Sequence, residues 1–361
     1  MNPARQFSTA TCLILCVGAF SGLRADEGKV LREKIRGPSL ENNAAGESAE
    51  RWVSVYLPPS YESSPKKRYP VLYLLHGIGD TDEMWMEKKE PNANIKDLMD
   101  RGIAEGRLRE MLVVMPDERT QWYGSFYTNS EWTGNWEDFT ARDLVKAIDE
   151  KYRTLARAAC RGIAGHSMGG YGAIKLGMKH PEVFSVVYGM NPAVLGWGGD
   201  LCIDNPAFAS VLKMTTREQL IAGGTYPMAI VCIAEAFSAN PKQAPFPVDF
   251  PFAMKDGKLQ PLEPAFSKWE ANMPVYMVKR YRDNLLKLRG LRFDSGWDDE
   301  YSHIVLTTRQ FSRTLTAEGI DHIFEEYNGD HRNRLRGRTG RLNVAVLPYF
   351  SLLLKADEPS P

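Results

Sequence analysis

Short apolar runs separated by helical segments limit the fold of this chain more than any other feature of its sequence. Residues 69–77 (YPVLYLLHG) and 110–117 (EMLVVMPD) are almost continuously apolar. Strands that read this way are typically covered by helices on both faces, which favours a parallel sheet. A helical stretch at about 94–105 lies between the two runs, so strand and helix alternate early in the chain.

The same alternation continues on both sides of an interruption. The pattern predicts helices at 135–152, 169–180, 307–320 and 341–355, and strands at 159–167, 183–192, 291–296 and 322–329. Repeated strand and helix units of this kind predict an α/β fold with a mostly parallel, doubly wound sheet. We expect one domain over 26–361.

Two segments depart from the parallel pattern. Residues 51–61 alternate between apolar and polar side chains, which predicts an antiparallel edge strand near the N-terminus with one wet face. From about 193 to 288 the alternation is lost, with a proline-rich stretch at 243–252 and helical stretches at 215–223 and 276–288. We interpret this part as a cap-like insertion over the edge of the sheet, without a buried strand.

The N-terminus and the overall charge bear on location and partners. An apolar run at about 10–20 follows Arg5 and is too short to span a bilayer, which predicts a cleaved signal peptide over 1–25 and a secreted or periplasmic protein without a stable membrane span. An uncleaved anchor is the alternative. Forty-five Lys and Arg balance forty-five Asp and Glu, so a nucleic-acid partner is not expected. The mature cysteines, Cys160, Cys202 and Cys232, allow at most one disulfide.

The pentapeptide Gly165-His166-Ser167-Met168-Gly169 lies between a predicted buried strand and a predicted helix. In this context G-x-S-x-G is typical of a nucleophile elbow, a strained turn that exposes the serine at the start of the helix. The alternative is a glycine-rich turn in which the serine only caps the helix. We predict that Ser167 is a catalytic nucleophile.

A serine nucleophile needs a base and a carboxylate that orients it. His331 follows the last predicted strand, where an imidazole can reach back over the elbow, and is our candidate base. The triad order Ser, Asp, His places the acid on the loop after 291–296. We choose Asp299 there, with Asp298 as the alternative.

An oxyanion hole needs two converging N–H donors. One is the N–H of Met168, directly after the nucleophile. The loop after 69–77 supplies the other, from Ile78 or, failing that, from Gly77. A strand-ending turn is the alternative role of this loop.

Four further residues are candidates for substrate binding. Trp122 and Tyr123 lie in an aromatic-rich loop after a parallel strand, and such loops meet at the ligand-binding edge of open α/β sheets. His303 is assigned as a possible substrate contact. Arg332 begins an arginine-rich stretch that either grips a carboxylate through its guanidinium groups or forms a solvated basic loop.

Linked motifs resemble the esterase family of α/β-hydrolases that includes S-formylglutathione hydrolase (esterase D), feruloyl esterases and mycolyltransferases. They are VYLPPSY, YPVLYLLHGIGD, TGNWEDF, GHSMGGYGAIKLGMKHPEVF, the Gly296-x-x-Asp299 loop and YNGDH, and they run from about 52 to 331 apart from the insertion. The resemblance implies Asp299 as the triad acid, His331 as the base and Ile78 as an oxyanion donor. The sequence around His331 departs from that of relatives, so the residues of the substrate pocket do not follow from the resemblance.

These observations predict an exported serine esterase that cleaves carboxylic esters, such as acyl-carbohydrate or aryl esters, through an acyl-enzyme and without a metal or organic cofactor. One alternative is an acyltransferase of the mycolyltransferase type, in which a sugar or lipid hydroxyl replaces water. A second is a binding protein on an inactive hydrolase scaffold. The sequence does not specify the oligomeric state.

Overall fold

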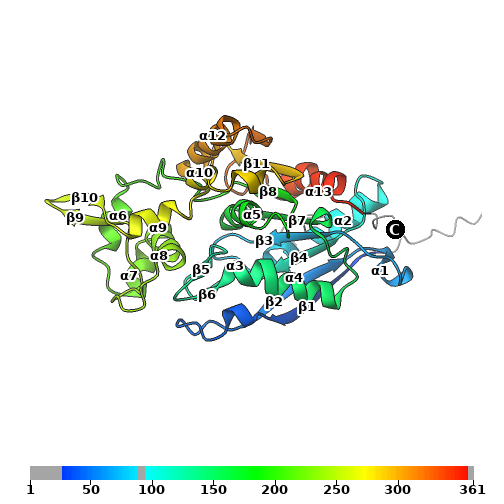
Figure 1. Cartoon of the computed structure of the whole chain (residues 1–361), viewed down its shortest axis with the longest axis horizontal. Helices are drawn as coiled ribbons and strands as arrows, with labels where there is room; N and C mark the ends of the chain where they lie inside the picture. Colours follow the sequence, from blue (N-terminus) through cyan, green and yellow to red (C-terminus); the bar gives the residue numbers. More distant parts are fainter. Residues whose placement is uncertain (1–26, 88–93, 357–361) are drawn as a thin grey trace, which may run out of the picture.

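An eight-stranded sheet forms the centre of the molecule (Figure 1), a computed structural model that describes residues 27–87 and 94–356. The predicted signal peptide lies outside the described residues. The strand order is β1-β2-β4-β3-β7-β8-β11-β12. The pairs β1/β2 and β2/β4 are antiparallel and the others are parallel. The strands are β1 (Lys29–Arg36), β2 (Glu50–Leu57), β3 (Val71–Leu75), β4 (Leu112–Pro116), β7 (Arg161–His166), β8 (Val186–Met190), β11 (Gly290–Gly296) and β12 (Ile323–Tyr327).

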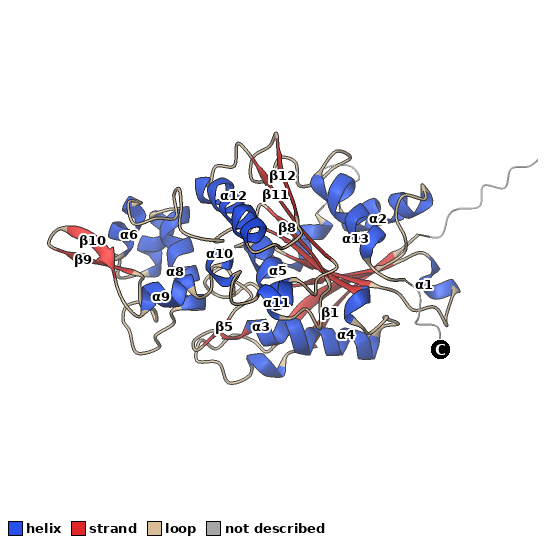
Figure 2. Ribbon diagram, turned by 45° about the horizontal axis from the view of Figure 1, so that its top comes forward, coloured by secondary structure: helices blue, strands red, loops and turns tan. Residues whose placement is uncertain are grey.

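Helices cover both faces of the sheet, as the continuously apolar strands predict (Figure 2). The helices of this domain are α1 (Ser60–Ser63), α2 (Ile95–Ala104), α3 (Trp136–Asp138), α4 (Val145–Lys151), α5 (Met168–Lys179), α12 (Ser302–Ala317) and α13 (Leu347–Leu353). Alternate residues of β3 enter different cores: Tyr73 lies in the core that α4, α5 and α12 share, and Leu72 in the one that α2 and α13 share. Burying one such leucine contributes about 1.5 to 3 kcal/mol.

Two predicted helices contain wider turns. The segment predicted at 135–152 consists of α3, a π-helical segment at Phe139–Leu144 and α4. The last predicted helix likewise begins with a π-helical segment at Leu342–Val346 before α13. Short 3-10 helices lie at Pro38–Leu40, Asp82–Met86 and Ala158–Cys160.

The predicted edge strand is one position inside the sheet. β2 pairs with β4 on one side and with β1 on the other, so β1 forms the edge. The expected wet face of β2 is also mostly buried. Ser54 donates a hydrogen bond of 2.7 Å to Asp82, and the Tyr56 hydroxyl donates one of 2.7 Å to Asp100. The polar atoms of this face, from which we expected contact with solvent, therefore form hydrogen bonds within the protein.

The region from 193 to 288 forms a group of short helices and a hairpin, much of it at one end of the sheet (Figure 1, left). It contains α6 (Pro206–Val211), α7 (Arg217–Ala222), α8 (Thr225–Phe237), α9 (Ala265–Glu270), α10 (Pro274–Met277), α11 (Arg282–Leu285), β9 (Phe252–Lys255) and β10 (Lys258–Pro261). A second small hairpin joins β5 (Asn129–Ser130) to β6 (Gly134–Asn135). The sequence did not single out α8, which is buried over most of its length because it packs against α6, α7 and α9.

The three cysteines of the described region, Cys160, Cys202 and Cys232, are free thiols. In the same residues, no helix is long and apolar enough to cross a membrane.

Candidate active site

Ser167 lies at the junction of β7 and α5 with a strained backbone. Its φ is 58° and its ψ is −118°, and its N–H donates a hydrogen bond of 2.9 Å to the carbonyl of Met190 on β8. A residue with a Cβ is held in this region only when its surroundings enforce it, at a cost of about 1 to 3 kcal/mol. The turn has the geometry expected of a nucleophile elbow.

The flanking glycines are needed because backbones meet here without room for side chains. A Cβ on Gly165 would lie 2.2 Å from the carbonyl oxygen of Gly169, and one on Gly169 would lie 2.3 Å from that of Leu75. These two oxygens are backbone atoms of α5 and β3, which cannot move aside as the end of a side chain can. The pentapeptide therefore fixes the close packing of α5 on the sheet.

The loops after β11 and β12 bring a carboxylate and an imidazole together. Asp299 Oδ2 lies 2.8 Å from Nδ1 of His331, and both residues are buried. The other carboxylate oxygen accepts a hydrogen bond of 2.9 Å from the N–H of Tyr301, which fixes its orientation. Asp298, the alternative acid, is exposed and accepts a bond from the indole of Trp297. Of the two aspartates, only Asp299 contacts the histidine.

The backbone carbonyl of His331 is held by two side chains whose role the sequence did not indicate. Nε2 of His166 lies 2.7 Å from it and Nδ2 of Asn191 lies 3.0 Å from it. Burial and the nearby His331 lower the pKa of His166 well below its ordinary value, so its ring is neutral and carries its proton on Nε2. The signal in the sequence was the position of His166 inside G-x-S-x-G, directly before the serine.

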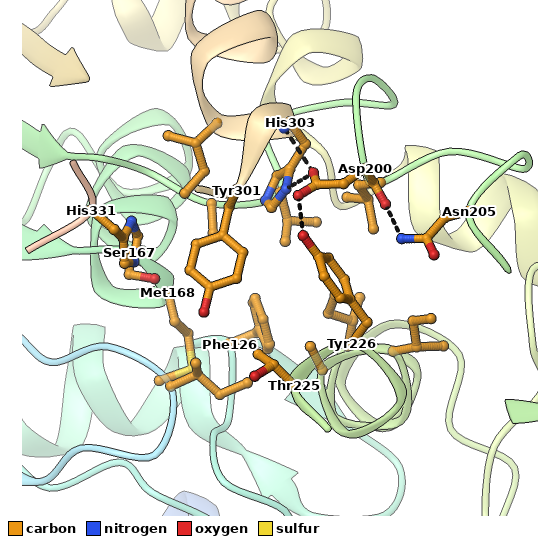
Figure 3. Close-up of a pocket in the computed structure, with 18 of the residues that line it drawn as sticks. Phe126, Ser167, Met168, Asp200, Asn205, Thr225, Tyr226, Tyr301, His303 and His331 are labelled. Atoms are coloured by element: carbon orange, nitrogen blue, oxygen red, sulfur yellow. Dashed lines mark hydrogen bonds and ion pairs between the residues drawn. The ribbon is translucent and has the colours of Figure 1, made fainter. Parts of the chain in front are cut away.

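Ser167 and His331 lie on the same pocket, side by side in Figure 3, with no hydrogen bond drawn between them. Catalytic hydrogen bonds are often long in unliganded enzymes and tighten with substrate. Gly77 lies against the serine, because a Cβ on it would be 3.4 Å from the Ser167 Cβ. The next residue, Ile78, lines the pocket together with Met168. Both predicted oxyanion donors thus belong to residues beside the serine.

The pocket runs from Ser167 between the sheet and the insertion. Its lining residues are Ile78, Phe126, Ser167, Met168, Ala193, Val194, Asp200, Leu201, Asn205, Phe208, Thr225, Tyr226, Ala229, Ile230, Ile233, Tyr301, His303, Ile304, His331 and Arg332. His303 and Arg332, two of the four candidates for substrate binding, are among them.

Trp122 and Tyr123 are not among the lining residues. Trp122 packs edge-on against Phe246, with ring centroids 6.0 Å apart, and the guanidinium of Arg217 lies over both aromatic rings. Packing against the insertion therefore occupies the two side chains that the sequence suggested for substrate binding.

Acidic partners engage several arginines of the stretch after His331. Arg341 is buried and bonds to Asp294 at 2.7 Å and to Glu325 at 2.6 Å. Arg336 forms an ion pair of 3.2 Å with Glu87. Arg332 reaches Asp80 at 3.4 Å beside the pocket. Arg341 thus forms ion pairs within the fold, whereas Arg332 lies at the pocket.

A comparison with protein-family models identifies the family. The model described as "Putative esterase" matches residues 48–335, which is most of the chain and contains the elbow, Asp299 and His331. The chain belongs to this esterase family. The fold of this esterase-family protein agrees with a solved ferulic acid esterase, with a TM-score of 0.62 at 24% identity, over 91% of this chain and 99% of that one. This likeness shows an α/β-hydrolase fold.

Curated relatives match a smaller part of this esterase-family chain. An esterase of Mycobacterium tuberculosis is 36% identical over 129 residues, which are 36% of this chain and 26% of the relative. An endo-1,4-beta-xylanase/feruloyl esterase of Xylanibacter ruminicola is 34% identical over 143 residues, 37% of this chain and 18% of the relative. The match therefore spans about a quarter or less of the length of these two relatives.

Proposed function

We propose that this protein is an exported serine esterase that hydrolyses carboxylic esters through an acyl-enzyme. The observation that carries the proposal is the 2.8 Å contact between Asp299 and His331, beside a serine in a strained elbow. Membership of the esterase family supports the same chemistry. Ser167, His331 and Asp299 are the proposed triad.

In the proposed reaction His331 Nε2 takes the proton of the Ser167 hydroxyl as its oxygen attacks the ester carbonyl. The bond to the leaving alcohol then breaks, and the imidazolium returns the proton to that alcohol. Asp299 accepts the Nδ1–H of His331, which keeps the neutral ring in the tautomer with a free lone pair on Nε2 and stabilises the charged ring that forms. Water repeats the sequence on the acyl-enzyme and releases the acid.

The tetrahedral intermediates carry a negative oxygen that needs donors. The N–H of Met168, at the start of α5, and the N–H of Ile78 are proposed to bind it. The first turn of α5 adds the positive end of the helix dipole. Each such donor stabilises the transition state by about 3 to 4 kcal/mol.

Acyl-carbohydrate and aryl esters are the proposed substrates. The names of similar proteins support this class, because a solved neighbour is a ferulic acid esterase and a curated relative carries feruloyl esterase in its name. The pocket is also suited to an apolar or aromatic group of the substrate, since Phe126, Phe208 and Ile230 are among its lining residues.

The test compares purified wild type with Ser167→Ala on p-nitrophenyl acetate and on a methyl ester of an aryl acid. We expect hydrolysis by the wild type and loss of nearly all of it in the variant, because no other residue supplies the attacking oxygen. Ser185→Ala is the matched control, because this buried serine lies outside the pocket. Adding an acceptor alcohol then separates hydrolysis from acyl transfer: a hydrolase releases mainly acid, and a transferase forms mainly the new ester.

A further inference from the structure

A second polar cluster lies in the same pocket as Ser167, with a buried histidine at its centre. Asp200 comes from the loop between β8 and α6, His303 from the first turn of α12, and Tyr226 from the first turn of α8. Figure 3 shows these three side chains together, on the opposite side of the Tyr301 ring from His331. The proposed triad uses none of them.

Asp200 has the hydrogen bonds of a carboxylate that stays charged. One oxygen lies 2.6 Å from Nδ1 of His303 and accepts a bond of 2.8 Å from its backbone N–H. The other accepts bonds from the backbone N–H of Ser302 and from the hydroxyl of Tyr226. Burial opposes ionisation, but the hydrogen bond from His303, the charge of this ring when it is protonated and the hydrogen bond from Tyr226 outweigh it and lower the pKa of Asp200 to about 2.

This arrangement fixes the tautomer of the His303 ring. An ionised carboxylate only accepts hydrogen bonds, so Nδ1 of His303 carries the proton that bonds to Asp200. In the neutral ring Nε2 then holds a lone pair and can only accept. Nε2 is buried and has no hydrogen-bond partner within the described residues, and His303 is 8% exposed. A buried acceptor without a donor is costly, so the site favours a ligand that brings one.

His331 and His303 lie on either side of the Tyr301 ring, so the part of a ligand that reaches from one histidine to the other is a short arm. The Tyr301 ring packs edge-on against His331 with centroids 4.9 Å apart, and its centroid is 6.4 Å from that of His303. One tyrosine ring therefore separates the reacting end of the pocket from Nε2 of His303. Apolar side chains also line the pocket, namely Phe126, Leu201, Phe208, Ile230, Ile233 and Ile304.

We propose that His303 Nε2 accepts a hydrogen bond from a hydroxyl group at the end of a short apolar arm of the substrate. The proposal rests on the proposed esterase function and specifies one recognition contact within it. The hydroxyl donates to Nε2, the arm contacts the apolar walls, and Asp200 keeps the ring in its accepting tautomer. A methyl ether at the same position has no proton to donate, and an unsubstituted arm leaves Nε2 unpaired.

The wild-type enzyme provides the first test. Two ester series of rising arm length are compared, one with the arm on the acyl side and one with it on the alcohol side, each ending in a hydroxyl, a methyl ether or hydrogen. In one of the two series, and at one arm length, we expect the hydroxyl ester to react best. Its kcat/KM should exceed that of the methyl ether and that of the unsubstituted ester of the same length by about tenfold to a hundredfold. If the hydroxyl gives no advantage in either series, or the methyl ether reacts equally well, the proposal is wrong.

The second test measures the same ratio in His303→Phe, which keeps a ring but has no acceptor. We expect the preference for the hydroxyl ester to fall to about one. His322→Phe is the matched control, since this histidine bonds to Ser312 and the carbonyl of Ile320 outside the pocket, and it should keep the wild-type preference. An unchanged preference in His303→Phe would overturn the proposal. If His303→Phe does not fold, the wild-type comparison decides alone, and loss of all ester cleavage in wild type would instead refute the proposed function.

Discussion

Nε2 of His166 donates a hydrogen bond of 2.7 Å to the backbone carbonyl of His331, and the two rings pack with centroids 4.6 Å apart. The residue directly before the proposed nucleophile thus holds the backbone of the proposed base. This contact links the elbow on β7 to the loop after β12. We interpret His166 as a positioning residue, because it acts on His331 rather than on the substrate.

Replacing His166 with Phe should lower kcat by about tenfold to a hundredfold, since a small displacement of a catalytic group is costly. The ring packing is retained and only the hydrogen bond is lost, so KM should stay close to that of the wild type. Steady-state kinetics on a p-nitrophenyl ester separate the two constants. A higher KM with an unchanged kcat would contradict a positioning role for His166.

Asp299→Asn should lower kcat by about ten-thousandfold, because an amide permits the wrong tautomer of His331. The neighbouring Asp298→Asn is the matched control and should have little effect, since Asp298 is exposed and bonds to Trp297. Ester hydrolysis by both variants at the same protein concentration checks this. Equal losses in the two variants would remove Asp299 from the triad.

Gly165→Ala should destabilise the protein by several kcal/mol, because the new Cβ would lie 2.2 Å from the backbone oxygen of Gly169. Gly198→Ala offers a control, since its Cβ would meet only side-chain atoms, a methyl group of Thr307 at 3.3 Å and the Cβ of Leu306 at 3.8 Å. Thermal or urea unfolding of both variants measures the difference. We expect a clear loss of stability for Gly165→Ala and a much smaller change for Gly198→Ala.

Glu118 makes the free energy of unfolding depend on pH. Burial raises the pKa of this carboxyl from 4.5 to about 8. Because the folded state binds the proton more tightly than the unfolded state, the stabilisation is complete below pH 4.5 and is lost as the pH rises through 8. Each unit of pKa shift corresponds to about 1.4 kcal/mol.

Glu118→Gln removes this titration, so its stability relative to the wild type should increase as the pH rises from 4.5 to 8. Urea unfolding at several pH values measures the difference between the two proteins. A constant difference over that interval would show that Glu118 does not titrate there.

The α/β order was predictable because its strands are short, apolar and bounded by turn residues. The runs around β3, β4, β7 and β8 indicated their strands, and G-x-S-x-G indicated the elbow at Ser167. The edge strand β1 was not predicted, because its sequence KVLREKIR is mostly polar and its pairing with β2 is a long-range property.

The candidate site was only partly predictable, for the same reason. Chain order and loop position pointed to Asp299 and His331, which the structure brings together. The pairing of Asp200 with His303 joins residues about a hundred positions apart, across an insertion whose fold the sequence did not reveal. Aromatic content and loop position also suggested Trp122, whose packing partner Phe246 lies in that insertion.

Labelling with a fluorophosphonate probe tests whether Ser167 is an activated nucleophile, because the probe reacts covalently with such a serine. After incubation with excess probe, intact-mass and peptide mass spectrometry locate the adduct. We expect one adduct, on Ser167, that the wild type forms, that is absent in Ser167→Ala and that His331→Ala forms much more slowly. A wild-type protein that stays unlabelled while hydrolysing esters, or an adduct on another serine, would contradict this role of Ser167.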